Sequence, residues 1–143
     1  MNRQDLKDES KETEGSPEVK AKIRRLQYET VKKAAKQAES ISKVNEATAI
    51  IVNPTHFAVA LKYDSDEMEA PKVVAKGQDL IAQRILEIAE ENSIIIVENP
   101  PLARALFATV DLDNEVPPEH YQAVAEVISY VWGLRRGKTE TEG

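Results

Sequence analysis

The amino-acid sequence predicts an α/β fold in which a small mixed β-sheet is covered by helices and preceded by one long N-terminal helix. The main observation is that short runs of β-branched and apolar residues are interspersed with segments whose apolar residues recur every three or four positions. A second observation is a basic, sparsely apolar helical pattern ahead of the first strand. The third is the length of 143 residues, which suits one domain with a helical extension.

The chain is expected to divide into a charged N-terminal segment with a basic linker helix over residues 1–46 and a globular domain over residues 47–143. Residues 1–15 are polar and charged, and we expect them to be mobile. Ser16 and Pro17 suit the cap and the first turn of a helix. A thin apolar stripe then predicts one amphipathic helix that ends near residue 45. The members of this stripe are Val19, Ile23, Leu26, Thr30, Ala34, Ala38 and Ile41.

Charge is unevenly distributed along the chain, whose formal net charge is −6. Residues 18–46 hold eight Lys or Arg against four acidic residues, whereas residues 47–143 hold eight against sixteen. A basic helix that leads out of a bilayer matches a cytosolic, lipid-facing position, and a solvated helix face is the alternative that the sequence alone slightly favours. Nucleic acid is disfavoured as a partner because the basic stretch lacks a binding signature and the remainder is acidic.

No stretch approaches the roughly 18 apolar residues of a membrane-spanning helix, and no signal peptide opens the chain. The absence of cysteine excludes disulfides, thiolate metal sites and thiol nucleophiles. We expect neither a metal nor another cofactor. His120 has no second ligand at metal spacing and is expected on the surface. Four acidic residues lack the glycine and the terminal glutamate of a calcium-binding EF-hand, namely Asp64, Asp66, Glu67 and Glu69.

The globular part is expected to contain four strands and three helices. The strands are residues 48–52, 57–63, 73–75 and 93–97, and the last is almost wholly apolar, as expected of a strand buried on both faces. The helices are residues 79–89, 102–107 and 118–134. On the last helix, six side chains are expected to face the core, namely Tyr121, Val124, Ala125, Ile128, Val131 and Trp132.

The turn between the first two strands carries the most informative motif, Asn53-Pro54-Thr55-His56. Asn and Pro suit the first two positions of a tight turn. Because Pro54 has no N–H, the usual route of deamidation after Asn53 is closed. The Asn53 side-chain nitrogen can instead attack its own backbone carbonyl carbon, close a succinimide and expel the Pro54 nitrogen, since both reacting groups belong to one residue. Thr55 could orient the turn by hydrogen bonding to its backbone, and His56 could carry protons at neutral pH.

An inert hairpin turn is the alternative interpretation of Asn53-Pro54, since such dipeptides commonly start turns. The domain would then be a non-cleaving interaction or scaffold domain. Asn99-Pro100 repeats the dipeptide without a histidine and opens a predicted helix, so we expect that bond to stay intact. A conventional hydrolase is disfavoured because no nucleophile, base and orienting group are visible together. Any catalysis is therefore expected to be a single self-cleavage per chain, without turnover.

A small apolar island at Met68, Ala70 and Pro71 lies beside the acidic loop. Apolar residues in a loop can form a contact surface, so Ala70 and Pro71 are candidates for binding substrate proteins. The alternative is a lead-in to the next strand that packs against the domain, which is the more common arrangement for apolar residues.

Four blocks of sequence follow one another in a recognisable order: Asn53 to Tyr63, Ala70 to Gly77, Pro100 to Leu106, and Tyr121 to Val127. Together with residues 4–9, they resemble the cytoplasmic domain of the FlhB/YscU/SpaS family of type III export proteins, in its flagellar branch. The likeness covers nearly the whole chain. Two departures are Asn99, where a small residue is expected before the paired prolines, and the run from Asp111 to Asn114, which lacks a glycine.

The resemblance implies self-cleavage between Asn53 and Pro54, with the two pieces staying associated. It also implies a switch in export specificity from rod and hook subunits to filament subunits. Further implications are a membrane domain ahead of this chain, a position on the cytoplasmic face of the bacterial inner membrane, and partners among exported flagellar subunits and other proteins of the export apparatus.

Overall fold

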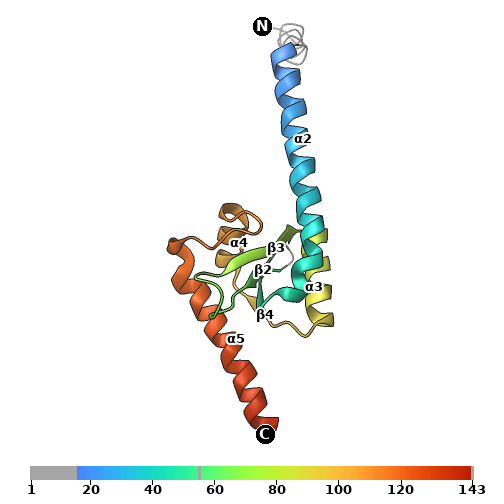
Figure 1. Ribbon diagram of the computed structural model, residues 1–143. Coiled ribbons are helices and arrows are strands. Elements are labelled where there is room, and N and C mark those ends of the chain that lie inside the picture. The colour runs from blue at the N-terminus through green and yellow to red at the C-terminus, as the bar shows by residue number, and fades with distance from the viewer. Residues whose placement is uncertain (1–15, 55, 143) are drawn as a thin grey trace, which may run out of the picture. The chain divides into compact units, whose positions relative to one another are not determined.

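The computed structural model describes residues 16–54 and 56–142, and their side chains as far as Arg135 (Figure 1). The segment 1–15, for which the sequence predicts mobility, and Thr55 lie outside the described residues. The described chain falls into two units that divide between Lys36 and Gln37. Among the described residues, no helix combines the length and the hydrophobicity that crossing a bilayer requires.

The first unit consists of most of α2 (Pro17–Ser40), which confirms the predicted long N-terminal helix. Its large apolar side chains are exposed, as a thin stripe implies: Ile23, Leu26, Tyr28 and Val31. The α-helix ends earlier than the sequence pattern predicts. A 3₁₀ helix, η1 (Ile41–Glu46), follows in the second unit, and its Val44 is fully buried in the core.

The second unit is built on a four-stranded mixed sheet, as predicted. β1 (Ala49–Asn53) and β2 (Phe57–Lys62) form an antiparallel hairpin, and β3 (Lys72–Gln78) continues it antiparallel to β2. β4 (Ile96–Glu98) pairs in parallel with β1, which gives the order β3-β2-β1-β4. β1 is therefore an interior strand, hydrogen bonded on both sides, and it ends at the residue that precedes Pro54.

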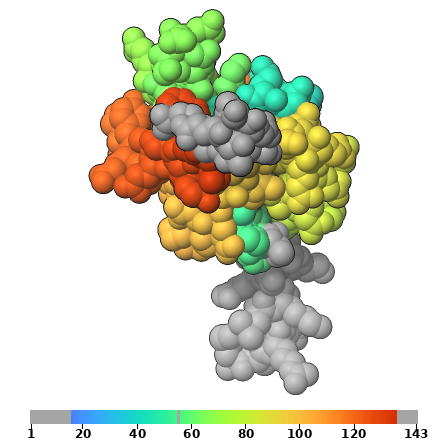
Figure 2. Space-filling view, turned by 90° about the horizontal axis from the view of Figure 1, so that it is seen from below, coloured from blue at the N-terminus to red at the C-terminus, as the bar shows by residue number. Residues whose placement is uncertain are grey.

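Helices cover both faces of this sheet. α3 (Leu80–Glu91) packs on one face, while α4 (Pro100–Thr109) and α5 (Tyr121–Glu142) pack on the other, with a short 3₁₀ helix, η2 (Pro118–His120), before α5. Figure 2 shows α4, in light orange, beside α5, in deep orange to red. Side chains alternate between the faces along each strand, so the core forms two separate clusters.

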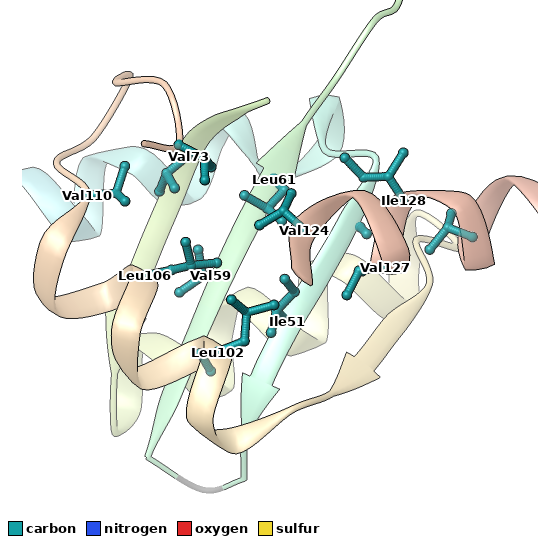
Figure 3. Close-up of a cluster of buried hydrophobic side chains, with 14 residues drawn as sticks. Ile51, Val59, Leu61, Val73, Leu102, Leu106, Val110, Val124, Val127 and Ile128 are labelled. Atoms are coloured by element: carbon teal, nitrogen blue, oxygen red, sulfur yellow. The ribbon is translucent and has the colours of Figure 1, made fainter. Parts of the chain in front are cut away.

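The larger cluster lies between the sheet and the pair α4 and α5 (Figure 3). Strand residues meet helix residues there, among them Ile51, Val59, Leu61, Val73, Leu102, Leu106, Val124 and Val127. The smaller cluster joins the opposite strand face to η1 and α3 through residues that include Val44, Ile50, Ala60, Val74 and Ile85.

β3 is longer than the sequence predicts. The run Lys76-Gly77 was expected to end the strand, but β3 continues through both residues to Gln78. The glycine is explained by packing instead, because α3 approaches the strand closely at this position. A Cβ atom at position 77 would lie 2.7 Å from Cβ of Ile81, a distance that real Cβ atoms do not tolerate. Gly77 thus serves helix–strand packing and does not interrupt the strand.

β4 differs from its prediction in both position and burial. Ile94 completes the end of α3, because its N–H donates to the carbonyl of Ala89 and Ser93 adopts a left-handed conformation with φ of 57°. Pairing with β1 therefore begins only at Ile96. The expectation of burial on both faces is wrong, since the three β4 residues are only partly buried or exposed at the edge of the sheet.

α5 confirms that a last helix is present, but it begins at Tyr121, after η2, continues to Glu142 instead of ending near residue 134, and buries a narrower stripe than predicted. Val124, Ile128 and Val131 are buried, as predicted. Tyr121 is 42% exposed and Ala125 is also exposed, so their predicted core positions are wrong. Trp132 is half-buried at the rim of the larger cluster. The apolar side of this helix is thus wider than the sheet can cover.

Candidate functional site

The hairpin tip between β1 and β2 is a tight turn, as the sequence predicts. The His56 N–H donates to the carbonyl oxygen of Asn53 at 2.7 Å, which closes a four-residue turn with Asn first and Pro second. Asn53 and Phe57 pair across the hairpin. Asn53 is half-buried, whereas Pro54 and His56 are exposed. The Asn53–Pro54 bond therefore lies at an accessible tip on a rigid base. Thr55, the predicted turn-setting residue, lies outside the described residues.

Two further backbone hydrogen bonds hold the base of this turn. The Asp79 N–H donates to the His56 carbonyl at 2.9 Å, and the Asn99 N–H donates to the Val52 carbonyl at 3.0 Å. The first contact comes from the β3–α3 junction and the second from the β4–α4 junction. Residues on both sides of the Asn53–Pro54 bond are thus anchored to separate elements of the sheet.

Asp79 is a residue that the sequence pattern did not single out. Its φ of 52° and ψ of −116° form a combination that glycine adopts readily and that is strained for other residues. This conformation places its N–H on the turn while its carbonyl accepts from the N–H of Gln83 in α3. A non-glycine residue in such a conformation gives no signal in the sequence, so only the structure could reveal it.

The two Asn-Pro dipeptides are in different environments. The Asn99 Oδ1 accepts a hydrogen bond from the Leu102 N–H at 3.3 Å, and Pro100 occupies the first turn of α4, as predicted. The Asn99 carbonyl accepts from the Ala103 N–H at 2.9 Å and is part of the helix. Within the described part of the chain, by contrast, no hydrogen bond holds the Asn53 carboxamide.

The candidate binding residues Ala70 and Pro71 lie at a surface pocket of about 260 Å³. Ala70 is 3% exposed, and the Pro71 carbonyl accepts from the Val116 N–H at 2.8 Å, so this segment also packs against the domain. The opposite wall comes from α5, and the Tyr63 and Trp132 rings stack with centroids 5.9 Å apart. The full lining is Tyr63, Glu69, Ala70, Pro71, Tyr121, Ala125, Ile128, Ser129 and Trp132.

The α5 half of this pocket was missed at the level of sequence. The signal was present, because Tyr121, Ala125, Ile128 and Trp132 follow helical spacing, but the pattern was assigned to the core. The width of that apolar stripe was the feature that could have indicated a surface pocket. A stripe wider than the sheet can cover leaves residues at the surface, where Figure 2 shows the β2–β3 connection, in light green, close to α5.

His120 is not the surface residue that was predicted. Its side chain is only 19% exposed, and Nε2 is buried without a hydrogen-bond partner in the described structure. The nearest acidic atom is Glu119 Oε1 at 3.8 Å. Within residues 16–54 and 56–142, the structure gathers no cluster of His, Asp and Glu that could hold a metal ion.

Lys76 is a second residue whose environment the sequence did not indicate. It is 9% exposed, and its Nζ donates to the carbonyls of Phe107 at 2.9 Å and Val110 at 2.8 Å. The ammonium also lies 5.1 Å from the centre of the Phe107 ring. A cation at the C-terminal end of α4 satisfies carbonyls that the helix leaves open and complements the helix dipole. Lys76 therefore ties β3 to the end of α4.

These features define a mixed α/β domain that presents an Asn-Pro bond at an exposed hairpin tip and an apolar pocket beside its last helix. The chain belongs to the FlhB HrpN YscU SpaS family, whose model matches residues 1–131.

Curated relatives and solved structures agree with this assignment. The chain is 50% identical over 136 residues to the flagellar biosynthetic protein FlhB of Salmonella typhimurium and 46% identical over 136 residues to that of Bacillus subtilis, covering 95% of this chain in both cases. It spans 34% and 36% of the two relatives, about a third of their length. The crystal structure of the cytoplasmic domain of FlhB from Shewanella putrefaciens is 44% identical, with a TM-score of 0.68 over 73% of this chain and 80% of that one. A mutated EscU C-terminal domain is 29% identical, with a TM-score of 0.62 over 64% and 92%.

Proposed function

We propose that this chain is the cytoplasmic part of a component of the flagellar type III export apparatus, that it cleaves itself once between Asn53 and Pro54, and that the cut changes which subunits are exported. The geometry of the turn is the observation that supports self-cleavage. Its scissile bond joins the half-buried Asn53 to the exposed Pro54, its carbonyl oxygen accepts a backbone hydrogen bond, and no hydrogen bond holds its carboxamide within the described part of the chain. Among the similar structures are EscU C-terminal domains in which an asparagine and the proline that follows it were each replaced.

The reaction proceeds in two steps. The Asn53 Nδ2 atom forms a bond to the Asn53 carbonyl carbon and loses a proton, while the carbonyl electron pair moves onto oxygen. The carbonyl then re-forms, the bond to the Pro54 nitrogen breaks, and that nitrogen takes a proton as it leaves. The products are a residue 1–53 piece that ends in a succinimide and a residue 54–143 piece with a free proline amine. Water later opens the succinimide.

The residues of the turn have separate roles in this proposal. Asn53 provides both the nucleophile and the electrophile, and Pro54 is the leaving amine whose missing N–H blocks the competing deamidation. The exposed His56 imidazole exchanges protons with water and with the reacting groups as an accessory carrier. Thr55 keeps the turn in its reactive shape.

The two pieces are expected to stay together after the cut. β1 pairs with β2 over five positions and with β4 over three, and Ile50 and Ile51 are fully buried on opposite faces. Cutting the tip removes the constraint between Asn53 and Phe57 but leaves this burial in place. The local consequence is a freed Pro54 segment at the surface, which gives the switch in specificity a physical basis.

The pocket beside α5 is the proposed docking site for exported subunits. Its lining is mainly apolar, and the stacked rings of Tyr63 and Trp132 give it a rigid wall. Such a pocket suits a single apolar side chain from an extended segment of the subunit. Pro71→Glu would place a charge at the partly buried wall of the pocket and is expected to weaken the binding of a purified rod or hook subunit at least tenfold, whereas Asp66→Ala, on the exposed part of the same connection, is expected to leave it unchanged.

The position of the chain in the cell is also a proposal. The relatives are about three times as long, and α2 carries the basic residues that a helix near anionic lipid would use. We infer a membrane domain ahead of residues 1–46 and a position of residues 47–143 on the cytoplasmic face of the bacterial inner membrane, in contact with other components of the export apparatus.

The test of self-cleavage is the intact mass of freshly purified protein under denaturing conditions. The parent is expected to give two pieces that end and begin at Asn53 and Pro54, Asn53→Ala is expected to give one chain, and Asn99→Ala is the matched control that should cut like the parent. Uncut chains in all three would remove the cleavage and favour an inert hairpin in a scaffold domain.

A further inference from the structure

The carbonyl oxygen of the proposed scissile bond already has a hydrogen-bond donor. The His56 nitrogen lies 2.7 Å from the Asn53 carbonyl oxygen before any attack, and an oxyanion donor acts at about 2.7–3.1 Å from the position that the anionic oxygen takes up. We propose that this backbone N–H is a catalytic group of the self-cleavage, one that stabilises the negative charge on the Asn53 oxygen when Nδ2 attacks. This inference rests on the proposed function, and it gives His56 a role that does not depend on its imidazole.

The donor is held in place by a second hydrogen bond on the same residue. The His56 carbonyl accepts from the Asp79 N–H at 2.9 Å, and Phe57, the next residue, enters β2 opposite Asn53. Asp79 makes this contact from its strained conformation. The orientation of the His56 N–H is thus fixed from outside the turn, which is the preorganisation that makes an oxyanion donor effective. Strain of this kind commonly accompanies a functional geometry.

The donor contributes at one point in the reaction. As the bond from Nδ2 to the carbonyl carbon forms, the oxygen becomes anionic and its hydrogen bond from His56 strengthens, since a charged acceptor makes a stronger bond than a neutral one. The N–H does not give up its proton. When the bond to Pro54 breaks, the oxygen returns to a neutral carbonyl, and the donor is now on the other piece of the chain. The donor therefore separates from the acceptor only after the charge is gone.

The loss of rate expected on removing the His56 N–H depends on how strong its hydrogen bond already is before attack. Because the hydrogen bond is already present before attack, only its additional strength in the transition state accelerates the reaction. A charge-assisted hydrogen bond is about twice as strong as a neutral one. We therefore expect loss of the N–H to slow cleavage about fivefold to tenfold, less than the hundredfold to thousandfold, roughly, that follows removal of a donor acting only on the oxyanion.

The experiment compares two proteins that differ only in this N–H. One carries His56→Ala, and the other carries L-lactic acid at position 56, which has the alanine side chain but an ester oxygen in place of the amide N–H. Cleavage at Asn53–Pro54 is followed by intact mass, which also separates it from hydrolysis of the ester itself. The control is malic acid at position 66, which removes the Asp66 N–H that donates to the Asp64 Oδ1 in an exposed turn elsewhere.

The inference predicts that the ester at position 56 cuts about fivefold to tenfold more slowly than His56→Ala and that the ester at position 66 cuts like the parent. Equal rates for the two position-56 proteins would overturn it. If the parent and His56→Ala both stay uncut, it is the proposed self-cleavage that fails. Thermal unfolding checks that each protein is folded. Should the ester at position 56 unfold, His56→Pro replaces it, because proline also lacks the N–H.

Discussion

The close approach of α3 to β3 makes Gly77→Ala a sharp test of how the site is supported. An added Cβ would lie 2.7 Å from the Ile81 Cβ and 3.4 Å from the Ile81 backbone carbon. A change of rotamer cannot relieve the first contact, because the position of a Cβ atom is set by its own backbone. The helix and the strand must therefore move apart.

The expected magnitude combines two opposing effects. Overpacking of this kind typically costs about 1–3 kcal/mol. The backbone of Gly77 is not in the left-handed region, so alanine is otherwise compatible and restricts the unfolded chain, which contributes about 0.4–1 kcal/mol in its favour. We expect a net loss of about 1–2 kcal/mol in the free energy of unfolding, on the central values of those two ranges.

Urea unfolding followed by circular dichroism measures this change, in an Asn53→Ala background so that the chain stays uncut. Gly133→Ala is the matched control, because its added Cβ meets no atom within 4 Å. It lies within α5, where alanine is favoured over glycine by about 1 kcal/mol, so a gain in stability is expected. In an Ile81→Gly background, Gly77→Ala is expected to become neutral or stabilising. A Gly77→Ala protein as stable as its parent would refute the close-packing argument.

Three further substitutions test the strain at Asp79, the contact of Lys76 with the end of α4, and the helix cap at Asn99. Asp79→Gly is expected to raise the free energy of unfolding by about 1 kcal/mol, because it relieves a backbone strain of roughly 1–3 kcal/mol. Cleavage should be preserved, because the N–H of residue 79 remains. Thermal unfolding and the cutting rate measure the two effects, and a less stable protein would contradict the strain. Lys76→Met is expected to cost about 1–3 kcal/mol in urea unfolding, since it leaves two carbonyls at the end of α4 without their donor; an unchanged midpoint would count against that contact. Asn99→Ala is expected to cost about 1 kcal/mol through the lost helix cap, measured in the same way, and cleavage at Asn99–Pro100 in the parent would show that the cap does not protect that bond.

Sequence patterns predicted most of the fold because the relevant signals are local. The β-formers on either side of Asn53-Pro54 give a hairpin with a tight turn, and the structure has both. The helical periodicity of α3 and the start of α4 at a proline were also predicted from the sequence. Each of these elements is specified by residues within a few positions of one another.

The errors arise where distant segments decide the outcome. Gly77 resembles a strand terminator, and only its packing against Ile81 shows that it permits the strand to continue. Ile94 was assigned to β4, but the end of α3 takes it through the bond to Ala89. The partners of Lys76 lie 31 and 34 residues away, so no local pattern could have shown them.

The features of the candidate site also fall into those that neighbouring residues specify and those that depend on distant segments. The reactive dipeptide is a covalent feature, so the sequence shows it directly. The donor on the Asn53 carbonyl, the Asp79 anchor and the α5 wall of the pocket depend on backbone conformation and on the register of a helix against the sheet. The catalytic roles of Asn53, Pro54, Thr55 and His56 and the binding role of Ala70 and Pro71 stay predictions.

The most direct measurement is the mass of the residue 1–53 piece, captured at low pH soon after the protein is made. Attack by the Asn53 side chain predicts an early species that is lighter by one water than the product of hydrolysis, because the succinimide forms without water, and this species should convert to the heavier one with time. A piece that carries the full hydrolytic mass from the earliest sample would show that water, and not Asn53, cuts the bond. An uncut chain would contradict self-cleavage altogether.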